Sequence, residues 1–163
     1  MQITKSCTLN APVQRVWDVL GEGFGDLRWV RSVSASSLEG ELAVGAVRSC
    51  EFEPSLLVSS GVARERLVEF DPQRYTLAYE LVEPSGPMRR AGSRWSVEPD
   101  GADARVTVVS TIELRPWAWP MTPMLRLFIG RIAGQTFDDL AQQLMRARRA
   151  DESTAPQSRP RER

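Results

Sequence analysis

Arg48, Glu65 and Tyr79 are the residues in this chain whose types and positions could support chemistry. Each falls in a stretch of alternating residues whose neighbours on the same face are mostly apolar, such as Phe52 beside Arg48 and Leu67 beside Glu65. Successive side chains of a β-strand point to opposite faces, so the three polar residues would lie on faces that are otherwise apolar. A buried charge is costly unless it is paired or reaches water, so Arg48 and Glu65 should either pair or line a wet cavity.

Two kinds of chemistry could follow from these side chains. Glu65 or Tyr79 could move protons while Arg48 stabilises an enolate, or the same groups could anchor the polar part of a ligand. Burial raises the pKa of a carboxyl group but an adjacent arginine lowers it, so a paired Glu65 would be a poor base. We therefore rank binding above catalysis. A slip of one residue in the alternation, such as one β-bulge produces, would instead place both charges in solvent.

The residue types in the chain give little support for a metal site or for nucleophilic catalysis. The chain has no histidine, and its two cysteines, Cys7 and Cys50, are far apart and form no C-x-x-C motif. Neither a zinc site nor a disulfide framework is indicated, and any proton transfer would fall to Asp, Glu, Tyr, Cys or water. We expect no metal and no cofactor.

Composition favours one domain without a nucleic-acid or membrane-spanning role. At 163 residues with 42% apolar residues, the chain suits a single globular domain over 1–150. Lys plus Arg and Asp plus Glu both number 21, so no net field attracts nucleic acid or an anionic membrane. There is no signal-peptide pattern and no apolar run of membrane-spanning length, so we expect a cytoplasmic protein without membrane insertion.

Most of the chain reads as antiparallel strands. The pattern predicts a strand over 2–9, a short helix from Asn10 to Gly21 and a second short helix over 26–30. The Gly21 to Gly25 stretch lacks the lysine of a P-loop and follows a helix, so we interpret it as a link. Turn residues at short intervals, with a loop over 54–60, then indicate a meander of six further strands over 33–38, 47–53, 61–70, 75–83, 89–98 and 105–114.

A long amphipathic helix over 122–149 should cover that sheet. Thr122 and Pro123 suit its first turn, and an apolar stripe that includes Ile129 and Phe137 recurs at three- and four-residue intervals. One helix cannot bury its own stripe, so the sheet must curl around it. The polar and charged residues 151–163 are predicted to form a disordered tail.

The tryptophans have different expected environments. Trp17 lies on the apolar face of the first helix and is predicted to be core, while Trp29 and Trp95 could be core or cavity wall. Trp117 and Trp119 lie between two prolines, where they could be exposed at an opening, an oligomer contact or a membrane surface. For these two we favour packing under the terminal helix.

Several short segments in a fixed order carry a resemblance to a known superfamily. They are APVQRVW at 11–17, FGDL at 24–27 leading into Trp29, VGAVR at 44–48, RERLVEFDP at 64–72 ahead of Tyr79, and Trp95. Over residues 4–145 the chain resembles the START-like or SRPBCC proteins with the Bet v 1 helix-grip fold, and among them the polyketide cyclase/dehydrase group.

The resemblance implies an α+β helix-grip fold, in which a curved seven-stranded antiparallel sheet wraps around a long C-terminal helix, with two short helices after the first strand. Members enclose a hydrophobic cavity and bind lipids, sterols, polyketides and similar molecules, and some catalyse cyclisation or dehydration. It favours placing Arg48 and Glu65 toward that cavity. Members that serve as Rieske oxygenase domains use a histidine and carboxylate iron site, which a chain without histidine cannot reproduce.

These considerations lead to three functional hypotheses. The first is binding of a hydrophobic or aromatic small molecule of polyketide, lipid or isoprenoid type, with the expected ligand-binding residues Trp29, Arg48, Phe52, Glu65, Tyr79, Trp95, Ile129 and Phe137. The second makes the cavity a cyclase or dehydratase active site, with Glu65, Tyr79 and Arg48 as candidate catalytic residues. The third is lipid transfer or protein interaction through residues 116–120, and a homodimer is a further option.

Overall fold

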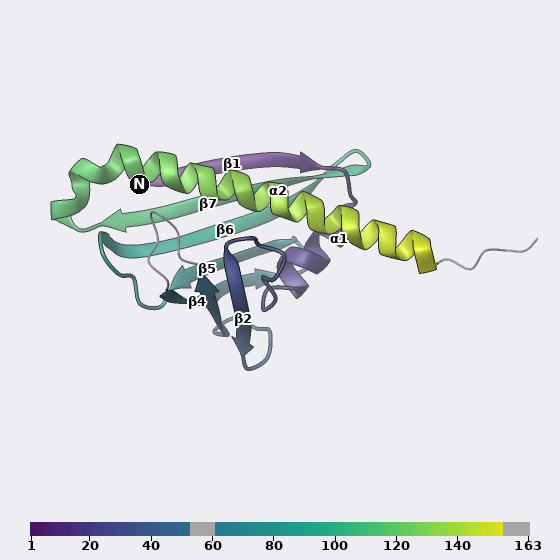
Figure 1. Ribbon diagram of the computed structural model, residues 1–163, viewed down its shortest axis with the longest axis horizontal. Helices are drawn as coiled ribbons and strands as arrows, with labels where there is room; N and C mark the ends of the chain where they lie inside the picture. Colours follow the sequence, from purple (N-terminus) through teal and green to yellow (C-terminus); the bar gives the residue numbers. More distant parts are fainter. Residues whose placement is uncertain (53–60, 155–163) are drawn as a thin grey trace, which may run out of the picture.

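The computed structural model of the chain describes residues 1–52 and 61–154 and contains one seven-stranded antiparallel sheet of order β1-β7-β6-β5-β4-β3-β2 (Figure 1). The strands and helices in chain order are β1 Gln2–Leu9, α1 Val13–Trp17, the π-helix η1 Asp18–Glu22, β2 Val33–Glu39, β3 Val47–Phe52, β4 Gly61–Asp71, β5 Thr76–Leu81, β6 Met88–Asp100, β7 Asp103–Leu114, the 3-10 helix η2 Pro116–Met121 and α2 Thr122–Thr154. The predicted fold class, with its curved sheet and long terminal helix, is confirmed. The predicted loop over 54–60 lies outside the described residues.

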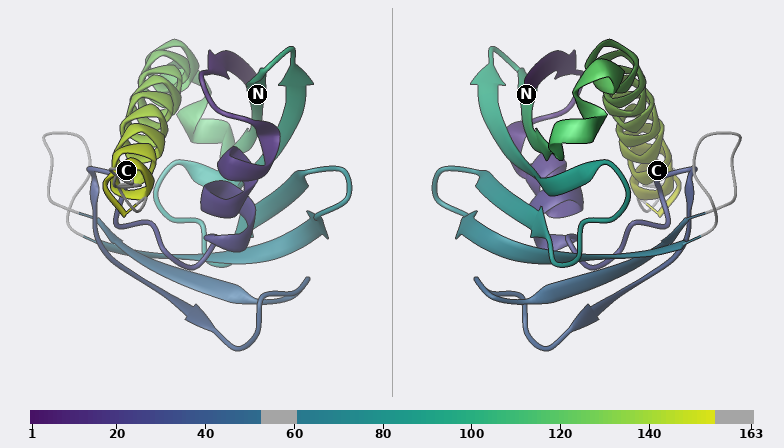
Figure 2. Two further views of the ribbon diagram at one scale, coloured as in Figure 1. Left: turned by 90° about the vertical axis from the view of Figure 1, so that its right-hand side faces the viewer. Right: turned by 90° about the vertical axis from the view of Figure 1, so that its left-hand side faces the viewer.

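The sheet curves strongly, and both α1 and α2 lie on its concave side (Figure 2). Every pair of neighbouring strands is antiparallel, and β7 joins the first strand to the rest of the meander. The register shifts between Val33 and Ala35, between Leu67 and Glu69, and between Met88 and Arg90. Such bulges bend strands, so these shifts contribute to the curvature that lets one sheet cover a helix.

The main core is formed by residues of α1, the sheet and α2, and it contains the fully buried Trp17, Phe24, Leu67 and Leu140. Trp17 is therefore a core residue, as predicted. Its indole ring lies against Gly21, where an added Cβ would come within 2.3 Å of the ring. This close approach explains why residue 21, inside η1, is a glycine, and it places the first part of the predicted link within helical structure.

The predicted second short helix over 26–30 is wrong. Instead, α1 runs directly into η1, and the residues that follow form turns. The Asp26 carboxylate accepts hydrogen bonds from the Arg28 backbone N–H at 3.1 Å and from its guanidinium Nε at 2.8 Å, while Ser36 Oγ accepts one from the Leu27 N–H at 2.8 Å. These side-chain acceptors bind the backbone N–H groups of Leu27 and Arg28, so turns are favoured over a helix here.

Helix α2 is longer than predicted and continues to Thr154. Asp151 lies in the helix and forms an ion pair with Arg15, so residues 151–154 are helical although we expected them in the disordered tail. The remainder of that tail lies outside the described residues. No helix in the described ranges is both long and apolar enough to cross a bilayer.

The expectation that Trp117 and Trp119 pack under α2 is also wrong. Both lie in η2, with 63% and 67% of their surface exposed, whereas Ala118 between them is buried. A 3-10 helix has about three residues per turn, so anchoring the small Ala118 against the protein turns its two neighbours outward.

Candidate functional site

A cavity of about 220 Å³ lies between the concave face of the sheet and α2. Its walls come from three parts of the chain: the sheet, the middle of α2, and the segment of turns between η1 and β2. Most of the lining is apolar, with residues Leu20, Phe24, Leu27, Trp29, Val30, Val33, Phe52, Leu77, Trp95, Val108, Ile129, Ile132 and Ala133. The polar lining residues are Ser32, Arg48, Glu65, Tyr79, Ser93, Ser110 and Thr136.

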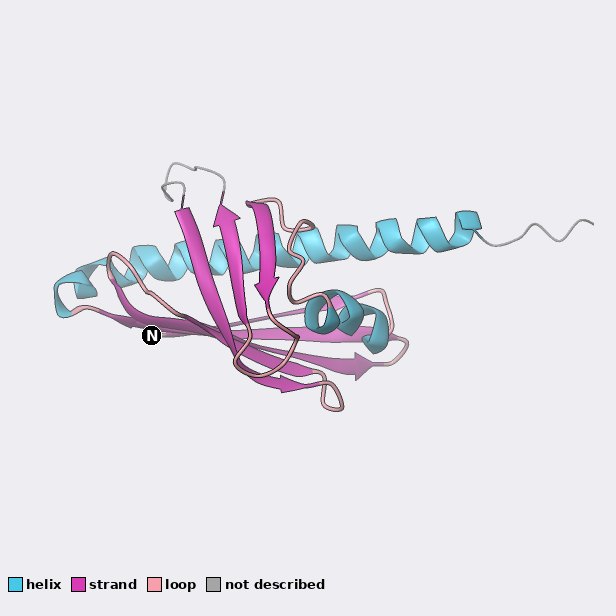
Figure 3. Cartoon of the chain, turned by 90° about the horizontal axis from the view of Figure 1, so that it is seen from below, coloured by secondary structure: helices cyan, strands magenta, loops and turns pink. Residues whose placement is uncertain are grey.

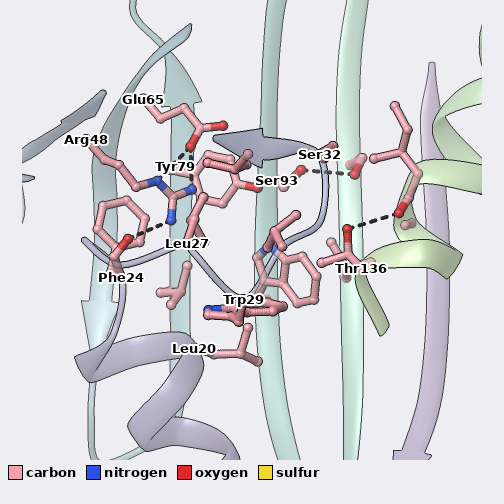
Figure 4. A pocket seen from close by; sticks show the side chains of 18 of the residues that line it. Leu20, Phe24, Leu27, Trp29, Ser32, Arg48, Glu65, Tyr79, Ser93 and Thr136 are labelled. Atoms are coloured by element: carbon pink, nitrogen blue, oxygen red, sulfur yellow. Dashed lines mark hydrogen bonds and ion pairs between the residues drawn. The ribbon is translucent and has the colours of Figure 1, made fainter. Parts of the chain in front are cut away.

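The Arg48 and Glu65 side chains form a buried ion pair at one end of this cavity (Figure 4). The two residues are directly opposite each other on β3 and β4, and they are only 4% and 9% exposed. Arg48 Nε donates to Glu65 Oε2 at 2.9 Å, Nη2 donates to the same oxygen, and Nη1 donates to the Phe24 carbonyl oxygen at 2.7 Å. The pair thus brings a neutral but strongly polar unit into an apolar chamber.

Aromatic rings complete the environment of the guanidinium. The Arg48 Cζ atom lies 4.0 Å from the centre of the Phe24 ring and 5.0 Å from that of Tyr79. Both distances are within the range of cation–π attraction. Burial opposes the charged guanidinium, but the Glu65 carboxylate more than offsets this and raises the pKa of Arg48. Arg48 is therefore a permanent, fixed cation.

The hydroxyl groups of the cavity extend from this charged end toward α2. Burial raises the pKa of the Tyr79 hydroxyl, which keeps it protonated and able to donate a hydrogen bond. Ser93 Oγ and Ser110 Oγ are 3.0 Å apart on neighbouring strands, and the Thr136 hydroxyl donates to the Ile132 carbonyl oxygen at 3.0 Å. Figure 4 shows Arg48, Tyr79, Ser93 and Thr136 distributed across the cavity from sheet to helix.

The charged end is better arranged for anchoring than for nucleophilic chemistry. Glu65 Oε2 already accepts two hydrogen bonds from Arg48, and the Cys50 thiol lies 3.8 Å from the same oxygen. Burial raises the pKa of the Cys50 thiol to about 12, so no reactive thiolate forms near neutral pH. The described residues also hold no group of three or more His, Cys, Asp or Glu side chains that could bind a metal ion.

A second hollow of about 210 Å³ adjoins the cavity at Val30, Ser32, Ile132 and Thr136, which line both. An unusual ion pair borders it. The buried Asp139 carboxylate of α2 accepts hydrogen bonds from the Arg31 backbone N–H at 3.0 Å and from its Nε and Nη2 at 2.9 and 2.7 Å. This contact, which we call the Arg31–Asp139 clasp, fastens the segment that carries Trp29 to the helix.

The structure places all but one of the predicted ligand-binding residues in the cavity lining: Trp29, Arg48, Phe52, Glu65, Tyr79, Trp95 and Ile129. Phe137 is the exception. It is buried in the core, with its ring centre 5.8 Å from that of Trp95 in an edge-on contact, so it supports the cavity wall from behind. Lining the cavity does not by itself show contact with a ligand, so ligand binding by these residues stays a prediction.

Arg48 and Glu65 both point toward the interior. The sequence alone had left open which face of their strands does so. Along β4, Arg64 and Arg66 are exposed while Glu65 and Leu67 are buried, and the bulge of that strand begins only after Leu67. The one-residue slip that would have put both charges in solvent is therefore wrong.

Sequence reasoning missed several lining residues, although usable signals existed. Ser110 alternates with the buried Val106, Val108 and Ile112 along β7, which is the same signal that singled out Glu65. Thr136 follows Ile129 and Ile132 at helical spacing, whereas Phe24 and Ser32 lie in turns and loops where no periodicity predicts direction.

Comparison with protein families gives a match over nearly the whole chain. A family model described as "Polyketide cyclase / dehydrase and lipid transport" matches residues 1–145. No curated protein matches the chain.

Solved structures share the fold at low sequence identity. The Zhui aromatase/cyclase from Streptomyces sp. R1128 is similar with a TM-score of 0.76 and 15% identity, covering 90% of this chain and 94% of that one. A point mutant of norcoclaurine synthase from Thalictrum flavum gives a TM-score of 0.69 and 14% identity, covering 91% and 96%. A protein from Thermus thermophilus gives 0.75 and 15%, covering 90% and 99%.

Proposed function

The chain belongs to the polyketide cyclase/dehydrase and lipid transport family, and from this premise we propose that it binds a compact hydrophobic or aromatic small molecule between the sheet and α2. The observation that carries the proposal is the cavity itself, which is apolar on most sides and polar at Arg48, Glu65 and a few hydroxyls. Apolar pockets with a small number of placed polar groups are the usual form of small-molecule sites.

The cavity volume limits the size of that molecule. An engineered cavity of about 150 Å³ in another protein accommodates benzene, so the 220 Å³ here suits a ligand on the order of ten heavy atoms. One ring or two fused rings fit this volume better than a long acyl chain or a multi-ring polyketide.

The polar end indicates how such a ligand would be oriented. Arg48 uses three of its five N–H groups in the contacts described above, and the protonated Tyr79 hydroxyl is a further donor. The ligand would therefore carry an oxygen acceptor, a carbonyl or hydroxyl group, on the side that faces Arg48 and Tyr79.

Titration with matched ligands tests the proposal. We would follow tryptophan fluorescence of the purified protein while adding 1-tetralone, its deoxygenated analogue tetralin, and palmitate, and use native mass spectrometry to look for a co-purified molecule. Trp29 and Trp95 line the cavity, so binding should change their emission. We expect 1-tetralone to bind more tightly than tetralin, and both more tightly than palmitate. Absence of binding by every compound, with nothing co-purified, contradicts the proposal.

A variant with a filled cavity gives the matched control. Ala133 is a buried lining residue of α2, so Ala133→Leu should reduce the volume and weaken 1-tetralone binding at least tenfold. Gln142 is exposed on the same helix and away from the cavity, so Gln142→Leu should leave the affinity unchanged.

A cyclase or dehydratase reaction in the same cavity is the second candidate function, and the placement of Tyr79 favours it. Its hydroxyl is protonated, and its ring lies next to the Arg48 cation, so it could deliver a proton to a ligand oxygen that the cation stabilises. If so, Tyr79→Phe should abolish turnover of a bound polyketide-type substrate with little loss of affinity. Glu65→Gln tests the alternative base, and unchanged turnover in either variant removes that residue from the mechanism.

A further inference from the structure

Four large apolar side chains are exposed within residues 117–127, where the sheet ends and α2 begins. Trp117 and Trp119 in η2 are 63% and 67% exposed, and Met124 and Leu127 in the first turns of α2 are 54% and 78% exposed. We call these four residues the tryptophan patch. Figures 1 and 3 show η2 and the start of α2 at one end of the molecule.

The backbone under the patch is held in place. Ala118 is fully buried, and the Thr122 hydroxyl donates a hydrogen bond to the Trp119 carbonyl oxygen at 2.6 Å, joining η2 to α2. Met124 and Leu127 are three residues apart, so they lie on the same side of the helix. Exposure of these side chains is thus built into the fold.

The charges around the patch are positive. Arg115, Arg126 and Arg131 are exposed, and the sequence from residue 115 to residue 137 contains no Asp or Glu. Within the described parts of the chain, none of the three arginines belongs to an ion pair. The acid that precedes this range, Glu113, lies opposite Arg90 in the β6–β7 register, while the Arg90 guanidinium forms its ion pair with Glu80. The overall charge of zero therefore conceals a local basic region around apolar side chains.

From this combination we propose that the tryptophan patch docks on the surface of an anionic lipid bilayer. Tryptophan is suited to the interface between headgroups and acyl chains, and nearby arginines are attracted to anionic lipids. No described helix could span the bilayer, so the contact is interfacial. The protein would rest on the membrane by its tip.

Docking at this end would bring the membrane close to the cavity. Leu127 of the patch and Ile132 of the cavity wall are five residues apart on α2, which corresponds to about 7.5 Å along the helix axis. Ile132 also lines the adjoining hollow beside the Arg31–Asp139 clasp. A ligand could therefore pass between bilayer and cavity. This exchange role rests on the proposed function, whereas docking itself does not.

The charges favour a bilayer over a second copy of the chain. In a two-fold dimer through the patch, the same surface of each copy meets the other, so two sets of arginines would approach without acidic partners between residues 115 and 137. An anionic surface pairs with the same arginines, and dimerisation becomes an outcome that the test must detect.

Vesicle flotation tests the docking. The full chain would be mixed with vesicles of phosphatidylcholine alone, or with about one third phosphatidylglycerol, at low and high salt. We expect flotation with the anionic vesicles, weakened by salt because surface charge attraction is screened. The double variant Trp117→Ala/Trp119→Ala should reduce binding at least tenfold, and Arg126→Gln/Arg131→Gln about fivefold per arginine. As a matched control, Val44→Ala/Val62→Ala changes two exposed apolar residues elsewhere and should bind like the original chain.

Two results would overturn the docking proposal. One is flotation that is absent, or unchanged in the double tryptophan variant. The other is a dimer, measured by analytical ultracentrifugation, that dissociates in that variant while no vesicle binding occurs. Titration with 1-tetralone in the same samples separates the two proposals: lost flotation with intact ligand binding refutes docking alone, and lost ligand binding with intact flotation refutes the cavity function alone.

Discussion

The charged end of the cavity and the tryptophan patch invert the usual distribution of side chains in opposite ways. Arg48 and Glu65 are charged and buried, whereas Trp117 and Trp119 are large, apolar and exposed. Burying an ion pair commonly costs as much desolvation free energy as the pairing returns, and exposing tryptophan forgoes its burial free energy. Neither arrangement is what stability alone would favour, which makes both regions candidates for function.

The two regions also differ in how many contacts hold them. The guanidinium of Arg48 has hydrogen bonds to Glu65 and Phe24 and two aromatic neighbours. The patch side chains project from η2 and the first turns of α2, and most of their surface is exposed. A change in the first region should therefore affect folding, and a change in the second should affect binding to partners only. The following predictions test this contrast, from the largest expected effect to the smallest.

Breaking the buried pair should have the largest effect. Glu65→Leu leaves Arg48 as an unpaired buried cation, and we expect the free energy of unfolding to fall by about 3–5 kcal/mol. Urea unfolding followed by circular dichroism measures this. Replacing both residues, in Arg48→Met/Glu65→Leu, should restore most of the loss. The exposed pair of Arg64 and Glu39 is the control, since Arg64→Met should cost less than about 1 kcal/mol. Equal losses of unfolding free energy at the buried pair and at the exposed pair would contradict this prediction.

Alkaline pH should reveal the buried thiol beside this pair. The pKa of Cys50 is raised from 9.0 to about 12, so between these values the unfolded chain has lost the thiol proton while the folded chain keeps it. The free energy of unfolding is therefore unaffected by this thiol below pH 9. Between pH 9 and pH 12 it falls by about 1.4 kcal/mol per pH unit. Unfolding measured from pH 8 to 11 should show at least this slope, and Cys50→Ala should reduce it, while the raised pKa values of Cys7 and Tyr79 leave a remainder. A slope that the variant retains must come from other groups.

Opening the Arg31–Asp139 clasp should have an intermediate effect. Asp139→Asn keeps the shape but removes the charge that three N–H donors share, so we expect stability to fall by about 2 kcal/mol. Because the clasp fastens one cavity wall to α2, 1-tetralone should also dissociate faster, as stopped-flow fluorescence would show. Arg28→Ala, at an exposed ion pair in the same segment, serves as the comparison. An unchanged dissociation rate would separate the clasp from ligand exchange.

Removing the exposed tryptophans should have the smallest effect on stability. Trp117→Ala/Trp119→Ala should alter the free energy of unfolding by no more than about 0.5 kcal/mol, because these rings contribute little packing. Trp17→Ala, in contrast, empties a core position and should cost about 3–5 kcal/mol. Thermal unfolding of the two variants compares them directly. A large loss in the double variant would mean that the patch serves folding.

The strands were predicted well because alternation and turn residues depend only on residues that are close together in the sequence. Alternation and turn residues gave the first strand, Gln2–Leu9, at its observed bounds and the start of the long helix at Thr122. The failures occur where side chains compete with periodicity. Asp26 and Ser36 replaced a predicted helix by turns, and the contact of Asp151 with Arg15 accompanies a helix longer than its apolar stripe.

The candidate site was accessible from sequence only in part. Alternation gave Arg48, Glu65 and Tyr79 mostly apolar neighbours on their own faces, because a strand fixes direction every second residue, but it left open whether those faces point inward. It could not distinguish Ile129, which reaches the cavity, from Phe137, which packs behind Trp95, because both belong to the same helical stripe. Nor could it show that Phe24 supplies both a ring and a carbonyl oxygen to Arg48, since that contact joins a loop to a distant strand.

By itself, the sequence determined the order of the strands along the chain, the apolar neighbours of the two charged residues on their strands and the absence of histidine chemistry, since these follow from residue type and short-range period. Only the tertiary structure decided that Arg48 and Glu65 pair, that a cavity of about 220 Å³ remains beside them, and that Trp117 and Trp119 face outward. The physical reason is that pairing, empty volume and exposure depend on how separate segments pack together, and no local pattern records the distance between them.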